Sequence, residues 1–468
     1  MALALRTDEP TAVTESRAPS APPQTFQRVM QLPDATALVI GCIIGAGIFR
    51  MASPIAGQVQ HVGLVLATWL AGGLISLCGA ICYAELGAAF PRSGGDYIYL
   101  TAAYGRVVGF LFGWTKLFIE RTGTIAILGF VCAEYLGYFT GYGAFGVRVA
   151  ATLAIAALTA ANLFGVRYGA GVQNLFTAIK LLALASIVAI GWGSGGARME
   201  LVQPWWPETL ALSHLQACGV ALVFVLWTYG GWTESAYVAE EIQRPERNVP
   251  RSILLGVGAT TALYLAVNFV YMLYVPLAEM PQHRLVASEM MRRALGPWAG
   301  GLIAMAVVCS TFGALNGYIL TSGRLLFAIG VDHAIVRRMG VVHPRWATPF
   351  RALLFNACWA IGLVWTGTLD QIVTYSTVVI SGFYALAGIS VIVLRHRHPE
   401  VERPYRVWGY PVVPVLFAAA MLIFVWDVCA RQPHDVGIGA ALLLAGAPLY
   451  AISQRIASRE AHLVKREA

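Results

Sequence analysis

Twelve long apolar stretches constrain the fold of this chain more than any other feature. Each is close to the roughly 20 residues that a helix needs to cross a bilayer. They lie at about residues 34–56, 63–90, 106–131, 147–164, 168–193, 214–240, 250–276, 298–328, 350–366, 371–396, 411–430 and 435–454. Because lipid offers no partner for backbone N–H and C=O groups, stretches of this length cross as helices. The pattern therefore predicts an all-α membrane protein with twelve transmembrane helices.

The composition excludes several other classes of protein. Apolar residues make up 58% of the chain and charged residues 12%, against about 45–50% and about 25% in soluble domains. The net charge of +8 is spread over many short loops, so no basic stripe exists to follow a nucleic acid. The eight cysteines form no Cys-x-x-Cys pair, which argues against a disulfide framework or a zinc site. No metalloprotease or Ser/His pattern supports an enzyme, and we expect no cofactor.

Lysine and arginine predict the orientation of the chain, because basic loops stay in the cytoplasm. With the N-terminus inside, 22 of these residues fall on the cytoplasmic side and six on the outer side. The remaining four lie within predicted spans. We expect a multi-pass protein of the cytoplasmic membrane with both termini inside. Residues 1–32, polar and without the apolar core of a signal peptide, are predicted to be a disordered tail, and residues 455–468 a second tail.

The first apolar stretch carries three glycines, Gly41, Gly45 and Gly47, where a membrane helix would have bulky side chains. Glycine costs about 1 kcal/mol relative to alanine inside a helix, and its backbone unwinds easily. Unwound backbone in a membrane is tolerated where it faces protein, water or a ligand. The cluster predicts a binding site at mid-membrane. Close packing of continuous helices through small residues is the alternative.

The sixth stretch is interrupted in the same way, at Gly230 and Gly231 within 227–234. Two glycine-broken helices five spans apart are typical of inverted-repeat transporters. Their free helix ends attract opposite charges, N-termini a carboxylate and C-termini an ammonium group, so a zwitterion such as an amino acid suits both. The predicted repeats are residues 33–193 and 214–396, with 411–454 outside the symmetry.

Bulky rings flank the second break, at Trp227 and Trp232. They could close over a bound substrate. Interfacial anchoring is the alternative for a membrane tryptophan, and the mid-span position of Trp227 argues against it.

Charged side chains inside the predicted spans are the next candidates. Lys180 lies near the middle of the fifth span, where lysine costs about 2.5–3.5 kcal/mol. We interpret it as a fixed cation, or a proton-carrying amine, beside the first break; snorkelling to the interface is the alternative. In the third span, Lys116 and the adjacent pair Glu120 and Arg121 favour a structural ion pair buried among helices.

Three carboxylates near cytoplasmic helix ends are candidates for an intracellular gate. Glu85 precedes a glycine-rich loop and could pair with an inner-loop arginine. Glu240 and Glu241 are followed by three arginines, at 244, 247 and 251, with which they could pair. Plain solvation of all three carboxylates is the alternative.

Nine segments in register resemble a known family. They are Ile44–Phe49, Cys82–Gly87, Pro91–Tyr97, Val172–Lys180, Tyr229–Trp232, Ala239–Glu241, Pro245–Arg251, Phe312–Gly317 and Glu402–Tyr405. Together they are similar to the L-type amino acid transporter branch of the amino acid–polyamine–organocation (APC) superfamily. The resemblance implies a LeuT-like fold of five-plus-five inverted repeats with two added helices, and alternating access without a cofactor.

The resemblance also implies where a substrate sits. Its carboxylate would bind the amides around Gly45, Ala46 and Gly47, and its ammonium group the carbonyls of Ile43, Trp227 and Gly230. Lys180 would occupy the region that holds an ion in sodium-coupled relatives. Transport is then expected to be independent of sodium, either by exchange or by proton coupling.

Three departures from the family pattern refine this expectation. Many relatives have serine where this chain has Ala46, so one hydroxyl donor is lost. Relatives often have phenylalanine at Trp227, and the larger ring favours small or medium neutral amino acids. Residues 135–147 lack the cysteine that tethers a heavy chain in animal light chains, so a stand-alone prokaryotic member is expected.

Three functions are consistent with the sequence. The first is sodium-independent exchange of L-amino acids across the cytoplasmic membrane. The second is proton-coupled symport of amino acids. The third, more distant, is a channel or sensor gated by amino acids.

Overall fold

A computed structural model describes residues 28–467, except 93, 164–165, 284, 347, 367–368 and 432, and omits the side chains of 164–174, 367–375, 435, 438 and 460–467. Most of the tail predicted at 1–32 lies outside these residues. Every regular element within them is a helix. An isolated parallel bridge joins Met30 to Ile242.

Ten of the described helical stretches are long and apolar enough to cross a membrane: Leu32–Arg50, Val62–Ala89, Arg106–Thr140, Ala144–Leu163, Leu175–Gly193, Pro245–Tyr274, Pro297–Asp332, Ser376–Arg397, Val412–Arg431 and Gly439–Arg459. Two shorter apolar helices, Leu212–Thr228 and Phe350–Thr366, accompany them. Each of the twelve predicted stretches overlaps one of these helices. The protein is therefore an all-helical membrane protein.

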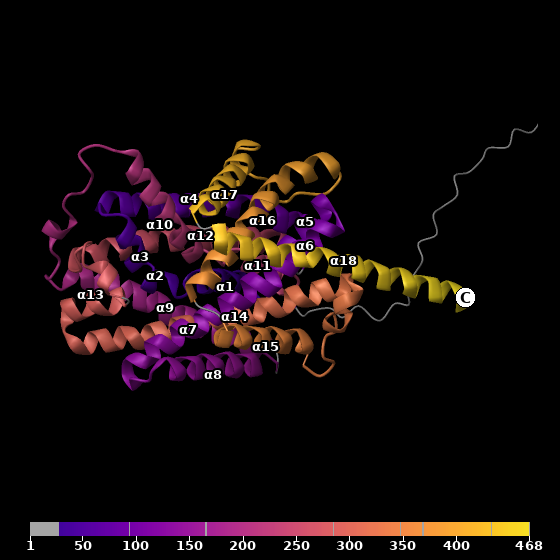
Figure 1. Ribbon diagram of the computed structural model, residues 1–468, viewed down its shortest axis with the longest axis horizontal. Coiled ribbons are helices and arrows are strands. Elements are labelled where there is room, and N and C mark those ends of the chain that lie inside the picture. Colours follow the sequence, from indigo (N-terminus) through magenta and orange to yellow (C-terminus); the bar gives the residue numbers. More distant parts are fainter. Residues whose placement is uncertain are drawn as a thin grey trace, which may run out of the picture.

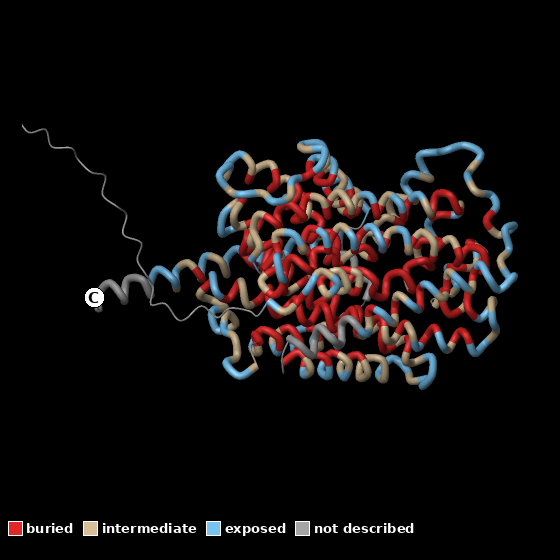
Figure 2. The backbone as a smooth tube through the Cα atoms, turned by 180° about the vertical axis from the view of Figure 1, so that it is seen from behind, coloured by how far each residue is buried: buried red, intermediate tan, exposed pale blue. Residues whose placement is uncertain are grey.

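The first long helix, α1 (Leu32–Ile43), lies in the centre of the bundle, packed against α9 (Val166–Gly193), α12 (Pro245–Tyr274) and α14 (Pro297–Asp332). The long helices run roughly along one direction (Figure 1). Buried residues concentrate in the middle of the bundle, whereas exposed residues gather at its rims (Figure 2). The elements in the centre are the ones expected to hold a site.

The remaining long helices surround this centre. One pair, α8 (Ala144–Leu163) and α15 (Phe350–Thr366), packs together along one edge (Figure 1). On another face, α4 (Val62–Ala89) contacts α12, and α16 (Leu369–Arg397) contacts α17 (Val412–Arg431).

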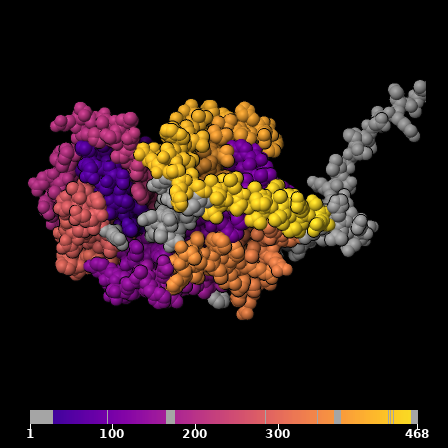
Figure 3. All heavy atoms as spheres, viewed as in Figure 1, coloured from indigo at the N-terminus to yellow at the C-terminus, as the bar shows by residue number. Residues whose placement is uncertain are grey.

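The last helix, α18 (Pro433–Glu467), extends past the rest of the molecule (Figure 3). It continues through residues 455–467, where the sequence suggested a separate tail.

The remaining elements are α2 (Gly47–Arg50), α3 (Ala52–Gln58), α5 (Asp96–Tyr104), α6 (Arg106–Thr115), the π-helix η1 (Lys116–Arg121), α7 (Thr122–Thr140), η2 (Met199–Val202), α10 (Leu212–Thr228), α11 (Glu234–Tyr237), η3 (Ala239–Glu241), η4 (Met280–Gln282), α13 (Val286–Leu295) and η5 (Ala334–Met339). The third predicted span ends later than expected, because α6, η1 and α7 run on to Thr140. Single π-turns inside helices occur often at functional sites, and η1 carries all three predicted charges of that span.

Candidate functional site

The break predicted in the first span is present between α1 and α2. The last helical bond there runs from the Ile44 N–H to the Ile40 carbonyl at 2.8 Å. Residues 44–46 then belong to neither helix, and Ile44 leaves helical geometry with φ −77° and ψ 76°. The chain turns helical again at Gly47. The alternative of a continuous helix packed through its glycines is therefore wrong for this segment.

The second break separates α10 from α11 and contacts the first. Residues 229–233 form turns, and Gly231 adopts φ +103°. A Cβ atom on Gly231 would lie 2.8 Å from the Cys42 carbonyl carbon, and one on Gly47 would lie 2.5 Å from Thr228 Cγ2. Gly231 is needed because it approaches the Cys42 backbone, and Gly47 because the Thr228 side chain occupies the place of a Cβ atom.

Lys180 and Tyr264 bind carbonyl groups at the end of α1, and Ser310 donates to the Ile44 carbonyl at 3.5 Å. The Lys180 ammonium group, fully buried on α9, donates to the carbonyls of Gly41 at 2.6 Å and Ile44 at 2.8 Å. The Tyr264 hydroxyl on α12 donates to the Ile43 carbonyl at 2.9 Å and lies 3.5 Å from the Thr228 carbonyl. Lys180 therefore neither snorkels nor faces lipid, and Tyr264 joins the two broken helices.

A cavity lies where the two breaks meet. All seven residues predicted to bind substrate line it, namely Ile43, Gly45, Ala46, Gly47, Trp227, Gly230 and Trp232. Residues of α1, α4, η1, α7, α10, α14, α16 and α17 complete the wall: Cys42, Ile75, Ser76, Glu120, Thr124, Leu128, Leu226, Thr228, Tyr318, Ser376, Thr377, Ile380, Ser381, Tyr384, Phe417 and Met421. Residues that are almost 190 positions apart in the sequence therefore line one cavity.

Some of the predicted backbone groups already have partners inside the chain. The Ile43 carbonyl accepts from the Gly45 N–H at 2.8 Å as well as from Tyr264. The Trp227 carbonyl accepts from the Gly230 N–H at 2.9 Å. A ligand that used these carbonyls would have to share or displace such bonds.

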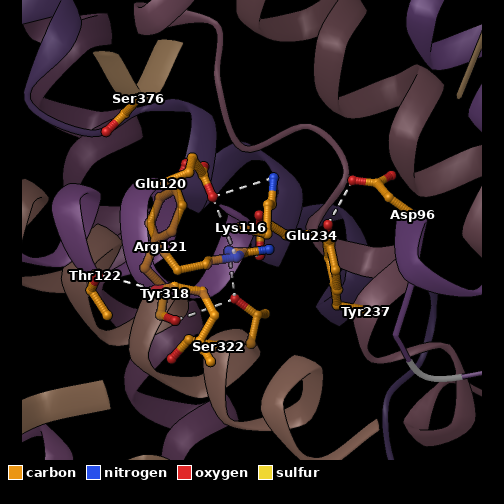
Figure 4. A network of polar contacts seen from close by, with 12 residues as sticks. Asp96, Lys116, Glu120, Arg121, Thr122, Glu234, Tyr237, Tyr318, Ser322 and Ser376 are labelled. Atoms are coloured by element: carbon orange, nitrogen blue, oxygen red, sulfur yellow. Dashed lines mark hydrogen bonds and ion pairs between the residues drawn. The ribbon is translucent and has the colours of Figure 1, made fainter. Parts of the chain in front are cut away.

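A network of buried charges borders the cavity (Figure 4). Lys116 Nζ lies 3.3 Å from Glu120 Oε2, and Arg121 Nε lies 3.8 Å from the same oxygen. Arg121 Nη1 also donates to Glu234 Oε2 at 2.7 Å, although 113 positions separate the two residues. The buried ion pair predicted in the third span is present, and it includes a partner at the second break.

Further contacts hold the Arg121 guanidinium group in place. It donates to Thr321 Oγ1 at 3.0 Å. Its carbon lies 4.5 Å from the ring centre of Tyr237 and 5.3 Å from that of Tyr318, distances at which cations are attracted to aromatic faces. Ionised residues inside a membrane are costly and mark functional regions. Arg121 connects η1 and α14 to α11, the helix that follows the second break.

Asp96 lies behind this network, at the start of the short helix α5. Its carboxylate accepts a hydrogen bond from the Tyr237 hydroxyl at 2.6 Å (Figure 4). The residue is fully buried, and this burial raises the pKa of the Asp96 carboxyl. Three carboxylates, of which Asp96 and Glu234 are buried and Glu120 is partly buried, thus accompany two buried cations, Lys116 and Arg121.

The first gate candidate, Glu85, is buried and paired. Its carboxylate accepts two hydrogen bonds from Arg395, at 2.8 and 2.6 Å, and one from the Val407 N–H at 2.7 Å. Arg403 Nε lies 3.5 Å away. Plain solvation of Glu85 is therefore wrong, and the contacts join α4 to α16 and the following loop.

The second pair of gate candidates differs from the prediction. Glu241 is buried and accepts a hydrogen bond from Arg324 Nε at 2.9 Å. The arginines at 244, 247 and 251 were the expected partners, but η3 turns the Glu241 side chain towards α14. Its backbone carbonyl accepts from the Met30 N–H at 2.9 Å, and Glu240 is half-buried.

Sequence reasoning missed three residues of the site. Glu234 follows the second break directly in the sequence, and a charged residue at that position inside a predicted span could have been identified as part of the site. Arg324 was counted with the basic loops although it lies inside α14. No signal distinguished Tyr264, because tyrosines are common in membrane helices.

The fold and cavity together define a class of protein. An all-helical membrane bundle with a cavity at two interrupted central helices is typical of membrane transporters that bind solute near mid-bilayer. Comparison with known proteins agrees. The chain belongs to the amino acid permease family, whose model matches residues 30–445. It is thus an amino acid permease of the APC superfamily, a transporter and not an enzyme.

Two groups of relatives are similar over most of their length. Mouse "Large neutral amino acids transporter small subunit 2" is 32% identical over 442 residues, which cover 91% of this chain and 81% of the relative. The human protein of that name is 31% identical over 437 residues, with 91% and 80% covered. Human "b(0,+)-type amino acid transporter 1" is 31% identical over 419 residues, with 87% and 84% covered.

Proposed function

We propose that the protein is a secondary transporter that exchanges small or medium neutral L-amino acids across the cytoplasmic membrane without sodium. The cavity between the two broken helices is the observation that carries this proposal. Membership of the permease family and similarity to amino acid transporters support it. Within the family, we propose that the chain belongs to the L-type branch and that it transports by alternating access.

The proposed substrate lies across the two breaks. Its carboxylate binds the amides around Ala46 and Gly47, while the Gly45 N–H stays engaged with Ile43. Its ammonium group reaches the carbonyls of Ile43, Trp227 and Gly230, sharing the first with Tyr264. Helix ends carry partial charges of the matching sign. Trp227 and Trp232 limit the size of the side chain, since both line the cavity.

Lys180 replaces a metal cation in this proposal. Its ammonium group binds two carbonyls at the end of α1, at 2.6 and 2.8 Å, which is the environment that a sodium ion would use. An ammonium group attached to the chain at this position removes the need for sodium in the transport cycle.

The proposed architecture has twelve spans in five-plus-five inverted repeats, residues 33–193 and 214–396, with 411–454 added. Both termini face the cytoplasm, as the positive-inside rule suggests. The pairs Glu85–Arg395 and Glu241–Arg324 then lie towards the cytoplasmic ends of their helices. We propose that they belong to the intracellular gate, with Glu240 beside them.

Proton-coupled symport is the second candidate, and one observation favours it. The charge network holds one carboxylate more than it holds cations, and Asp96 is that extra group. Burial raises its pKa, so it could bind a proton during the cycle. In the exchange mechanism Asp96 neither gains nor loses a proton during the cycle.

Uptake of labelled L-alanine into proteoliposomes tests the proposal. Exchange requires a lumen preloaded with amino acid, whereas symport is driven by an imposed pH gradient into empty vesicles. Saturable uptake in either case establishes transport. Flux that never saturates would indicate a channel, and binding without flux would indicate a sensor; either result would overturn the proposal.

The proposed transporter needs no heavy-chain subunit. Residues 135–147 lack the cysteine that would tether one, and a prokaryotic member would work alone. Transport by the purified single chain in proteoliposomes is the expected result, and activity that appears only with a second subunit would contradict it.

A further inference from the structure

The cavity has two chemically different walls. Towards η1, α7 and α16 most of its lining is polar, with Glu120, Thr124, Ser376, Thr377, Ser381 and Tyr384 beside the apolar Leu128 and Ile380. Towards α4, α10 and α17 most of it is apolar, with Ile75, Leu226, Phe417 and Met421 beside the hydroxyl groups of Ser76 and Thr228. A cavity that recognised aliphatic side chains alone would not need a carboxylate and several hydroxyl groups in its wall.

Glu120 stands out within the polar wall because it is ionisable and faces the cavity. Its side chain keeps 13% of its exposure, whereas those of Lys116 and Arg121 keep 1% and 0%. Its Oε2 atom is buried without a hydrogen-bond partner and faces the two cations (Figure 4). Ser376 Oγ on α16 donates to the carbonyl of Ile119, the residue before Glu120, at 3.2 Å. This bond holds α16 beside Glu120.

We infer that Glu120 selects amino acids whose side chain carries a neutral hydrogen-bond donor, a hydroxyl or a carboxamide group. This inference rests on the proposed function and names its substrate class. A hydroxyl donated to Glu120 satisfies a carboxylate that has already lost most of its water. An aliphatic side chain of equal size leaves that carboxylate facing a methyl group, which is unfavourable.

The charges around Glu120 explain why the donor is neutral. Lys116 and Arg121 balance Glu120 and Glu234 one for one, at 3.3, 3.8 and 2.7 Å. The remaining carboxyl, Asp96, is bonded to Tyr237 on the far side of the network. A cationic side chain at Glu120 would therefore find the charge of that carboxylate already balanced by Lys116 and Arg121, with little to offset its lost hydration.

Isosteric amino acids test the inference in the wild-type protein. Threonine and valine differ by a hydroxyl in place of a methyl group, as do serine and the four-carbon L-2-aminobutyrate. The measurement is the concentration of each amino acid that halves the uptake of labelled L-alanine by proteoliposomes. Threonine is expected to compete at least about tenfold better than valine, because sites built to bind a hydroxyl reject analogues that lack it. Equal or better competition by valine would overturn the inference.

Variants at Glu120 show whether this carboxylate is responsible. Glu120→Leu is expected to reduce the threonine-to-valine preference to about one, and Glu120→Gln, which keeps an acceptor oxygen, to leave part of it. The matched control is Glu134→Gln on α7, whose carboxylate lies outside the cavity lining and 3.8 Å from Arg50; it should keep the wild-type preference. An unchanged preference in Glu120→Leu would overturn the inference. Should that variant fail to insert, Glu120→Gln decides in the same way.

Two further results separate this inference from the proposed function. Lysine should compete less well than glutamine, and equal competition would contradict the charge balance. Saturable alanine uptake with no preference for hydroxyl groups would overturn the inference alone. Absence of uptake, and of competition by every L-amino acid, would overturn the proposed function.

Discussion

Replacement of Lys180 by alanine is the sharpest test of how the first break works. The change removes an ammonium group that donates to the carbonyls of Gly41 and Ile44, at 2.6 and 2.8 Å. Hydrogen bonds to charged groups contribute about 1.5–3 kcal/mol each, so the two together contribute about 3–6 kcal/mol. Burial of a lysine in a membrane costs about 2.5–3.5 kcal/mol, and the variant is relieved of that cost.

The net effect on stability is thus a loss of about 0–3 kcal/mol, which an inserted helical bundle tolerates. The effect on the transport cycle is larger, because both lost bonds hold the end of α1, whose backbone forms part of the proposed binding site. A shift of about 3 kcal/mol changes the population of a conformation more than a hundredfold. We expect Lys180→Ala to insert normally and to lose at least about nine-tenths of its exchange activity.

The assay compares initial uptake rates in proteoliposomes at equal amounts of inserted protein. Thr177→Val is the matched control. Its hydroxyl lies one turn earlier on α9 and donates to the Ala37 carbonyl at 3.1 Å, where α1 is still regularly wound. That neutral bond is worth about 0.5–1.5 kcal/mol, so uptake should stay near wild type. Wild-type flux in Lys180→Ala, or an equal loss in both variants, would refute the reasoning.

Three other perturbations follow from the same site. Trp227→Phe should admit larger side chains, which a competition panel of twenty amino acids would reveal; an unchanged profile would remove this ring from the binding site. Replacement of sodium by choline should leave uptake unchanged, and a steep sodium dependence would contradict the role given to Lys180. Gly231→Ala should lower thermal stability and uptake, since φ is +103° and the new Cβ would lie 2.8 Å from Cys42; Gly219→Ala, with Asp427 at 3.6 Å, is the tolerated control.

The sequence by itself determined the helical segments and both breaks. Lipid leaves few choices to a long apolar stretch, because each backbone N–H and C=O group must be paired within the helix. Glycines inside such a stretch weaken it at a defined place, so Gly45 and Gly230 located the interruptions to within a few residues. The residues around them could therefore be assigned to one cavity from the chain alone.

Only the tertiary structure decided which charges meet. Arg121 and Glu234 are 113 positions apart, and Glu241 pairs with Arg324 instead of with the arginines that follow it. Which charges meet depends on how each helix is rotated about its axis and on which helices pack against it. The apolar pattern of a helix that is buried on most sides predicts neither its rotation nor its neighbours. The polar wall that α16 and η1 build around Glu120 depends on the same packing. Local physics thus located the breaks, and long-range packing determined what surrounds them.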